Sequence, residues 1–124
     1  MPTINLDNTI TLSLSVKDRA QSVAWYGKHL GFKHLYDADE MGWSEMATHT
    51  EGVTIGLGDM DEVQAGNCVP VFGVADLDSA RKALEAESVR FDGDTIHEEG
   101  MVKIATFYDP DGNALMIAED LSQP

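Results

Sequence analysis

The chain has 124 residues, of which 22 are acidic and 8 basic, giving a formal net charge of −14. This length suits one domain with one ordinary core, and a hydrophobic content of 43% is typical of a globular protein. The negative charge opposes binding to a phosphate backbone, which argues against a nucleic-acid partner. No apolar run approaches the ~18 residues of a membrane span, and residues 1–8 lack the features of a signal peptide. We therefore expect a soluble, cytoplasmic protein without membrane contact.

The first half of the chain is predicted to form a strand, a helix and three further strands. Residues 10–16 alternate apolar side chains with threonine and serine, which is the period of a strand with one small polar face. Asp18 is typical of a helix start, and Gly31 ends that helix. Breaks around glycines then separate three short strands, predicted at 32–36, 43–48 and 53–57.

The second half is predicted to follow the same order. Strands are expected at 69–74, at Phe91 with 95–97 as a ragged strand, at 103–108 and at 114–119. Asp76 begins a helix between the first two of these strands. The segment 109–113 is a turn between the last two, in which Pro110 fixes φ and Gly112 accepts a positive φ.

An internal repeat relates the two halves. The matched positions are Val16-Lys17-Asp18 with Val74-Ala75-Asp76, Phe32 with Phe91, and Val53 with Leu115. Since the element order repeats as well, we predict an α+β fold of two βαβββ modules with a period of roughly 60 residues. The modules are expected at about residues 9–58 and 68–120 of a single domain, 1–124.

The two predicted sheets each have a face that their helix does not cover. On this face the strands carry small or polar side chains, which leave room for a ligand or for a second sheet. We expect a curved mixed sheet around a cavity, and ligand contacts from residues on this face. The expected ligand-binding residues are Thr11, Ser13, Trp43, Thr54, Thr106, Tyr108 and Met116.

This pattern resembles the vicinal oxygen chelate superfamily, which includes glyoxalase I, bleomycin resistance proteins and extradiol dioxygenases. The segments that carry the resemblance are Ser15-Val16-Lys17-Asp18, 22–26, Leu30-Gly31-Phe32, 74–80 and 106–113. The resemblance implies paired βαβββ modules around a U-shaped cavity, usually in a homodimer. The linker at 59–68 is long enough for modules to pair either within one chain or across the dimer.

The resemblance also implies a metal position with one His, Gln or Glu on each of four strands. By distance from the shared motifs, these positions fall on Thr11, Thr54 or Gly56, Val69 and Met116. None of these residues supplies the imidazole or carboxylate ligands that divalent cations need. Glu119 is the nearest carboxylate, but its spacing puts it on the opposite strand face. We therefore expect no metal and no cofactor at this position.

Two classes of function fit the sequence. The first is a metal-free binding protein of the glyoxalase/bleomycin resistance type, which holds a small organic molecule in the cavity of a dimer. The acidic composition suits a cationic ligand, although it also serves solubility. The alternative is a lyase, isomerase or dioxygenase-like enzyme that uses a displaced metal or acid–base residues such as His97 or Tyr108. No catalytic residue and no ligand identity follows from the sequence.

Overall fold

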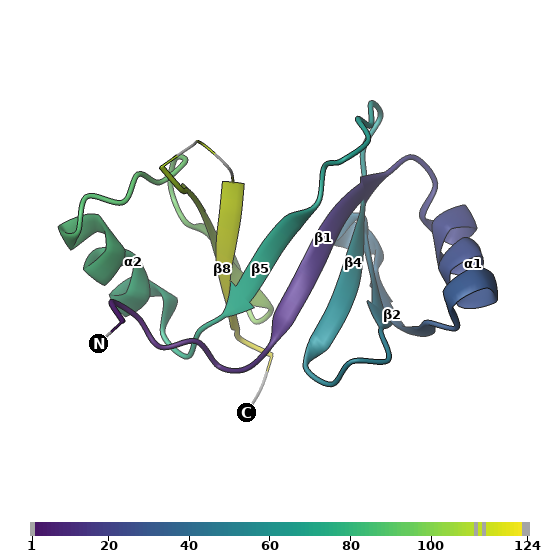
Figure 1. The fold of residues 1–124 in the computed structure, drawn as a ribbon, viewed down its shortest axis with the longest axis horizontal. Helices are drawn as coiled ribbons and strands as arrows, with labels where there is room; N and C mark the ends of the chain where they lie inside the picture. The colour runs from purple at the N-terminus through teal and green to yellow at the C-terminus, as the bar shows by residue number, and fades with distance from the viewer. Residues whose placement is uncertain (1, 111, 113, 123–124) are drawn as a thin grey trace. The chain divides into compact units, whose positions relative to one another are not determined.

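The computed structural model describes residues 2–110, 112 and 114–122, so Asp111 and Asn113 of the predicted turn lie outside the described residues. The chain divides into two compact units. Unit A is Ile10–Val69, and unit B combines Met1–Thr9 with Pro70–Pro124, so that the boundary falls after the first residue of the strand Val69–Gly73, which is described with unit B. Each unit contains one helix and a sheet of four strands in the order strand, helix and three strands (Figure 1). The predicted α+β class and the repeated βαβββ module are therefore confirmed.

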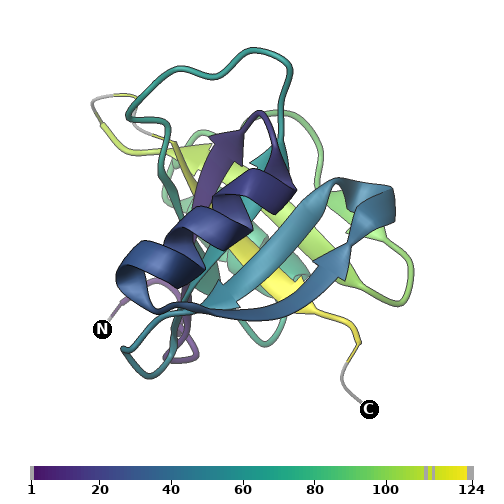
Figure 2. The same ribbon diagram turned by 90° about the vertical axis from the view of Figure 1, so that its right-hand side faces the viewer.

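Unit A contains a mixed sheet with the strand order β2-β3-β4-β1. Its elements are β1 (Ile10–Val16), α1 (Arg19–Leu30), β2 (Lys33–Ala38), the 3-10 helix η1 (Asp39–Met41), β3 (Trp43–Ala47) and β4 (Val53–Asp59). Strand β1 runs parallel to β4, with Thr11 opposite Thr54, whereas β2, β3 and β4 pair antiparallel. Figure 2 shows α1 lying across the strands of this unit.

Local sequence signals set the ends of α1. The Asp18 side chain accepts a hydrogen bond from the backbone N–H of Gln21, and Gly31 ends the helix at φ 72°. Val23 and Tyr26 of the helix pack on a buried cluster of the sheet that consists of Met46, Ile55 and Leu57. On one face of the sheet, the side chains therefore pack in the core beneath α1, and the alternate side chains of each strand point to the other face.

Unit B repeats this arrangement with the strand order β5-β8-β7-β6. Its elements are β5 (Val69–Gly73), α2 (Leu77–Ala86), β6 (Ile96–Glu98), β7 (Val102–Tyr108) and β8 (Ala114–Asp120). Strand β5 runs parallel to β8, and β6, β7 and β8 pair antiparallel. The core beneath α2 consists of Val74, Leu77, Ala80, Ala105 and Ile117.

The matched aspartates of the repeat have the same role. Asp76 accepts from the backbone N–H of Ser79 and begins α2 with φ −140°, against −138° at Asp18. The ragged strand predicted at Phe91 and 95–97 corresponds to an isolated bridge between Phe91 and Phe107 and to β6, which covers Ile96–Glu98. Gly93, at φ 65°, turns the chain between these two pairings. Neither helix, in the part of the chain that the structure describes, is both long and apolar enough to cross a bilayer.

Candidate functional site

A buried carboxylate, Glu45, lies on the face of the unit A sheet that α1 does not cover. Its neighbours in β3, Ser44 and Met46, are 1% exposed, and Met46 packs in the core beneath the helix. Because side chains alternate along a strand, Glu45 is directed to the opposite face. It is nevertheless only 9% exposed. Within β1, β3 and β4 as described, it is the one carboxylate on this face.

Neutral donors hold both oxygens of the Glu45 carboxylate. Trp43 Nε1 donates to Oε1 at 2.7 Å, and the Tyr36 hydroxyl donates to the same oxygen at 3.3 Å. The Thr54 hydroxyl donates to Oε2 at 2.6 Å, and the Thr11 hydroxyl lies 3.4 Å from Oε2 and 2.9 Å from that of Thr54. No described residue places a cation against this carboxylate. The network therefore positions a negative charge without neutralising it.

Two glycines of β4 make room for the Trp43 indole beside this carboxylate. A β-carbon added to Gly56 would overlap the indole ring, and one added to Gly58 would lie 3.5 Å from Trp43 Cε3. One face of the indole consequently packs on the backbone of β4, and its other face is turned away from the sheet. The aromatic face and the carboxylate together form a platform that we call the Trp43–Glu45 face.

The structure brings three of the predicted ligand-binding residues together around Glu45, namely Thr11, Trp43 and Thr54. Ser13 lies on the same face, opposite Gly56. Glu45 itself was not predicted. The strand register equates Glu45, opposite Gly56 in unit A, with Thr106, opposite Met116 in unit B, whereas the sequence match of Val53 with Leu115 equates Gly56 with Ala118 and so gave no signal for Glu45.

The other predicted residues lie on the corresponding face of unit B. Ala105 and Ile117 are buried in the core beneath α2, so that Thr106, Tyr108 and Met116 are directed to the opposite face. All three are half-buried. The guanidinium of Arg90, which the sequence did not single out, lies over the Tyr108 ring at 4.7 Å from its centroid.

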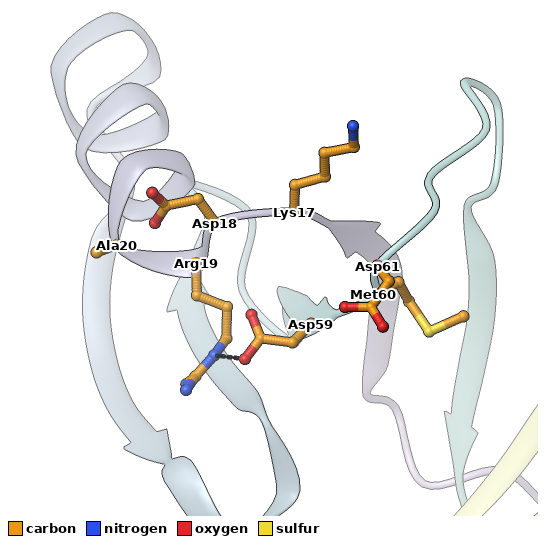
Figure 3. A pocket seen from close by; sticks show the side chains of 7 residues that line it. All are labelled: Lys17, Asp18, Arg19, Ala20, Asp59, Met60 and Asp61. Carbon is orange, nitrogen blue, oxygen red and sulfur yellow. Dashed lines mark hydrogen bonds and ion pairs between the residues drawn. The ribbon is translucent and has the colours of Figure 1, made fainter.

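An open hollow of about 700 Å³ lies at the start of α1 (Figure 3). Its lining residues are Lys17, Asp18, Arg19, Ala20, Asp59, Met60 and Asp61, and it includes none of the predicted ligand-binding residues. Arg19 donates to Asp59 at 2.9 Å and to Asp39 at 3.1 Å, and the hydrogen bond to Asp59 is the main cause that raises the pKa of Arg19. The charge of Arg19 is therefore already matched within the protein.

Arg19 also anchors strand β3 from the helix side. It donates to the carbonyl oxygen of Trp43 at 2.8 Å and to the Ser44 hydroxyl at 3.0 Å. Ser44 in turn donates to Asp37 at 2.6 Å, and this bond, followed by that with His34, lowers the pKa of Asp37. These contacts lie on the face opposite Glu45, so that the two faces of β3 carry separate polar networks.

Other candidate groups have structural partners. Glu119 Oε1 accepts from the backbone N–H of Leu77 at 2.8 Å, which places Glu119 on the helix face of β8 as its spacing indicated. His97 lies on the exposed strand β6, 3.7 Å from Glu99. Among the residues that the structure describes, no group of three or more His, Cys, Asp or Glu side chains is arranged to hold a metal ion.

The family model of the Glyoxalase/Bleomycin resistance protein/Dioxygenase superfamily matches residues 8–117 of this sequence. The chain belongs to this superfamily. The match confirms the resemblance to the vicinal oxygen chelate proteins, and it extends over both units. No curated protein sequence matches this chain significantly.

Solved structures of the same fold include several epimerases. Methylmalonyl-CoA epimerase from Mycobacterium tuberculosis is 18% identical, with a TM-score of 0.77 over 100% of this chain and 93% of that one. A Streptomyces coelicolor methylmalonyl-CoA epimerase variant in complex with 2-nitronate-propionyl-CoA is 17% identical, with a TM-score of 0.71 over 94% and 99%. A superfamily member from Vibrio splendidus 12B01 is 18% identical, with a TM-score of 0.64 over 94% and 100%. Likeness at these identities shows the fold alone.

The metal position of the superfamily does not fit the residues of this member. Thr11 and Thr54 share a hydrogen bond at 2.9 Å and both lie against Glu45, so that their hydroxyls are already engaged. The other two positions are Val69, which offers no donor atom, and Met116, which offers only a thioether. One carboxylate with two hydroxyls is a poor donor set for a divalent cation.

Proposed function

We propose that this superfamily member is a metal-free binding protein for a small organic cation, which it holds on the Trp43–Glu45 face. The observation that supports this proposal is the 9% exposed Glu45 carboxylate, which four neutral donors orient and no described cation neutralises. A buried carboxylate without a counter-charge lowers the stability of the folded state through its desolvation, and a bound cation would offset this effect.

The chemistry of the face suits an ammonium or amidinium group. The face of the Trp43 indole that does not pack on β4 can attract a cation through the ring quadrupole. Glu45 adds a charge-assisted hydrogen bond or, for a quaternary ammonium group, a direct charge interaction. The formal charge of −14 would raise the local concentration of cations around the protein. A neutral ligand of the same shape would gain neither the attraction to the indole ring, nor the charge interaction with Glu45, nor the attraction by the net negative charge.

We also propose that the protein is a homodimer, which the resemblance to this superfamily implies. In this proposal a second copy of the chain helps to enclose the ligand, because a platform on one sheet face does not surround a small molecule by itself. The dimer is a separate claim, with its own test in the Discussion.

The alternative function is an acid–base enzyme of the isomerase or lyase type, in which Glu45 accepts a proton from a bound substrate. It is favoured by the isolation of this carboxylate on one sheet face and by the epimerases among the structures of similar fold. Glu45 suits this role better than the acid–base residues expected from the sequence, because His97 lies on the exposed β6 and Tyr108 lies under Arg90.

A titration with choline and its neutral isostere 3,3-dimethyl-1-butanol tests the binding proposal, with tryptophan fluorescence, to which Trp43 and Trp25 both contribute, and calorimetry as readouts. We expect saturable binding of choline that is at least about tenfold tighter than that of the alcohol. Glu45→Gln should remove this preference, whereas Glu40→Gln, which removes one exposed acid from η1, should preserve it. Equal affinity for the two compounds, or an unchanged Glu45→Gln variant, would contradict the proposal.

Two further measurements separate the alternatives. Elemental analysis of the purified protein should find no stoichiometric zinc, nickel, manganese or iron, and about one metal per chain would overturn the metal-free claim. Deuterium incorporation from D2O into acyl thioester probes, lost in Glu45→Gln and retained in Glu40→Gln, would instead establish the acid–base enzyme.

A further inference from the structure

The sequence contains three arginines, and two of them are satisfied within the protein. Arg19 binds Asp59 and Asp39. Arg81 donates to Glu85 at 3.2 Å, to the Thr95 hydroxyl at 3.1 Å and to the Gly93 carbonyl at 2.7 Å. Arg90 differs from both, because within the described residues its guanidinium contacts the Tyr108 ring and donates no hydrogen bond.

The backbone fixes the place of Arg90 in unit B. The Tyr108 N–H donates to the Arg90 carbonyl at 3.1 Å, and the Asp92 N–H donates to the Thr106 carbonyl at 2.8 Å. The segment 90–92 therefore runs beside β7. Phe91, between them, packs on the core beneath α2. Arg90 is accordingly directed to the other face, where Tyr108 lies.

We propose that Arg90 and Tyr108 form a binding site for an oxyanion, either a carboxylate or a phosphate, of a small organic molecule. A guanidinium that stacks on an aromatic ring keeps its N–H groups free in the plane of the stack. These N–H groups form a fork that matches two oxygens of a carboxylate or a phosphate. The ring thus orients the cation without using a hydrogen-bond donor, which is the arrangement that an anion site requires.

The surrounding charge sets the strength of this site. The chain carries a formal charge of −14, and Asp92 and Asp109 are neighbours of the site along the chain. Their field opposes anions, but salt screens it beyond a Debye length of ~8 Å at physiological ionic strength. Hydrogen bonds to Arg90 act at about 3 Å, well inside this length, but Arg90 is exposed, so that solvent weakens them as well. We therefore expect millimolar affinity for a simple anion and tighter binding when an organic body adds contacts on Tyr108.

The site is independent of the Trp43–Glu45 face, which belongs to unit A. The two proposals can be tested separately, because they concern different residues and the two sites would bind ligands of opposite charge.

An NMR titration of the 15N-labelled full chain with acetate, and separately with inorganic phosphate, tests this inference at constant ionic strength. We expect a saturable shift of the Arg90 Nε–H signal and of the Tyr108 amide, while the Arg81 Nε–H signal stays in place. Saturation by acetate alone assigns a carboxylate, saturation by phosphate alone assigns a phosphate, and saturation by both assigns the shared oxyanion chemistry.

Matched variants decide whether the shifts report a site. Arg90→Gln should abolish saturation, Tyr108→Leu should weaken binding several-fold, and Lys82→Gln, which removes an exposed cation from α2, should leave it unchanged. A dispersed spectrum of each variant shows that it remains folded. Shifts that do not saturate, that persist in Arg90→Gln, or that affect all three arginines alike would indicate an adventitious ion only and would overturn the proposal.

Discussion

The indole of Trp43 occupies the space that a β-carbon on Gly56 would need. This relationship couples two adjacent strands of unit A, because the ring can lie on β4 and reach Glu45 only while position 56 has no side chain. Gly56 is buried, and it is also the residue opposite Glu45 in the sheet. One glycine therefore determines the position of both groups of the platform.

We predict that Gly56→Ala displaces the indole and lowers the free energy of unfolding by about 1–3 kcal/mol, since overpacking forces side chains off their rotamers. The hydrogen bond from Trp43 to Glu45 should be lost, and choline binding with it. Urea denaturation and Trp fluorescence measure the two effects.

Gly27→Ala is the matched control for Gly56→Ala. A β-carbon at Gly27 would meet the Phe32 carbonyl oxygen at 3.6 Å, an ordinary contact, and alanine favours a helix by about 1 kcal/mol. We expect its stability to be unchanged or higher. If the two variants had equal stability and equal fluorescence, the proposed overlap at Gly56 would be wrong.

A second prediction concerns the hairpin between β7 and β8. Gly112 has φ 88°, and its N–H donates to the Asp109 carbonyl at 3.0 Å. Gly112→Val should lower the free energy of unfolding by about 1–3 kcal/mol, because a β-branched residue is strained at positive φ. Apart from its two neighbours in the chain, no described residue has a heavy atom within 4 Å of an added β-carbon, so conformation rather than contact is the cause. Gly112→Asn should cost less, since asparagine tolerates this region, and thermal melts that match the parent for both variants would contradict the prediction.

A third prediction concerns acid denaturation. Hydrogen bonds from the Ser79 backbone and hydroxyl lower the pKa of Asp76. A carboxyl whose pKa is lower in the folded state contributes stability above its unfolded value of ~3.9, and that contribution is lost as the pH falls through the folded value. Asp76→Asn keeps a capping side chain but cannot titrate.

The urea midpoint of the parent should therefore fall more steeply below about pH 4 than that of Asp76→Asn. The urea midpoint of Asp76→Asn should still fall with decreasing pH, in part because Asp37, whose pKa is lowered by Ser44 and His34, becomes protonated. Parallel curves for the parent and Asp76→Asn would show that the cap hydrogen bonds do not affect the titration.

A fourth prediction concerns assembly. We expect a C2 homodimer in solution. Because each chain carries a formal charge of −14, like-charge repulsion opposes association, and added salt should tighten the dimer. Sedimentation equilibrium at low and moderate salt measures this directly. A monomer of 13.5 kDa at both salt concentrations would contradict the predicted homodimer.

The repeated architecture could be predicted from the sequence because its signals are local. Asp18 and Asp76 each begin a helix by accepting a hydrogen bond from a residue only three positions further along the chain. Strand alternation also assigned Thr11 and Thr54 to the face that the helix leaves uncovered, whereas their pairing in register was not predicted.

Glu45 and Arg90 could not be predicted in the same way, because their surroundings come from distant parts of the chain. A glutamate in a short strand is usually solvated. Glu45 is buried only because Trp43, Thr11 and Thr54 cover it from three strands. Arg90 lies between recognised elements, and its contact with Tyr108 depends on a backbone pairing across 18 residues of sequence.

The attachment of Arg19 to strand β3 has a consequence for how such a fold diversifies. Arg19 and Asp37 hold the Trp43 carbonyl and Ser44 from the helix side, with no contribution from the side chains of Trp43 or Glu45. Substitutions at position 45 therefore leave these anchoring bonds in place. The ligand specificity of β3 can therefore change, in evolution or by protein engineering, while the hydrogen bonds that hold the strand in place are kept.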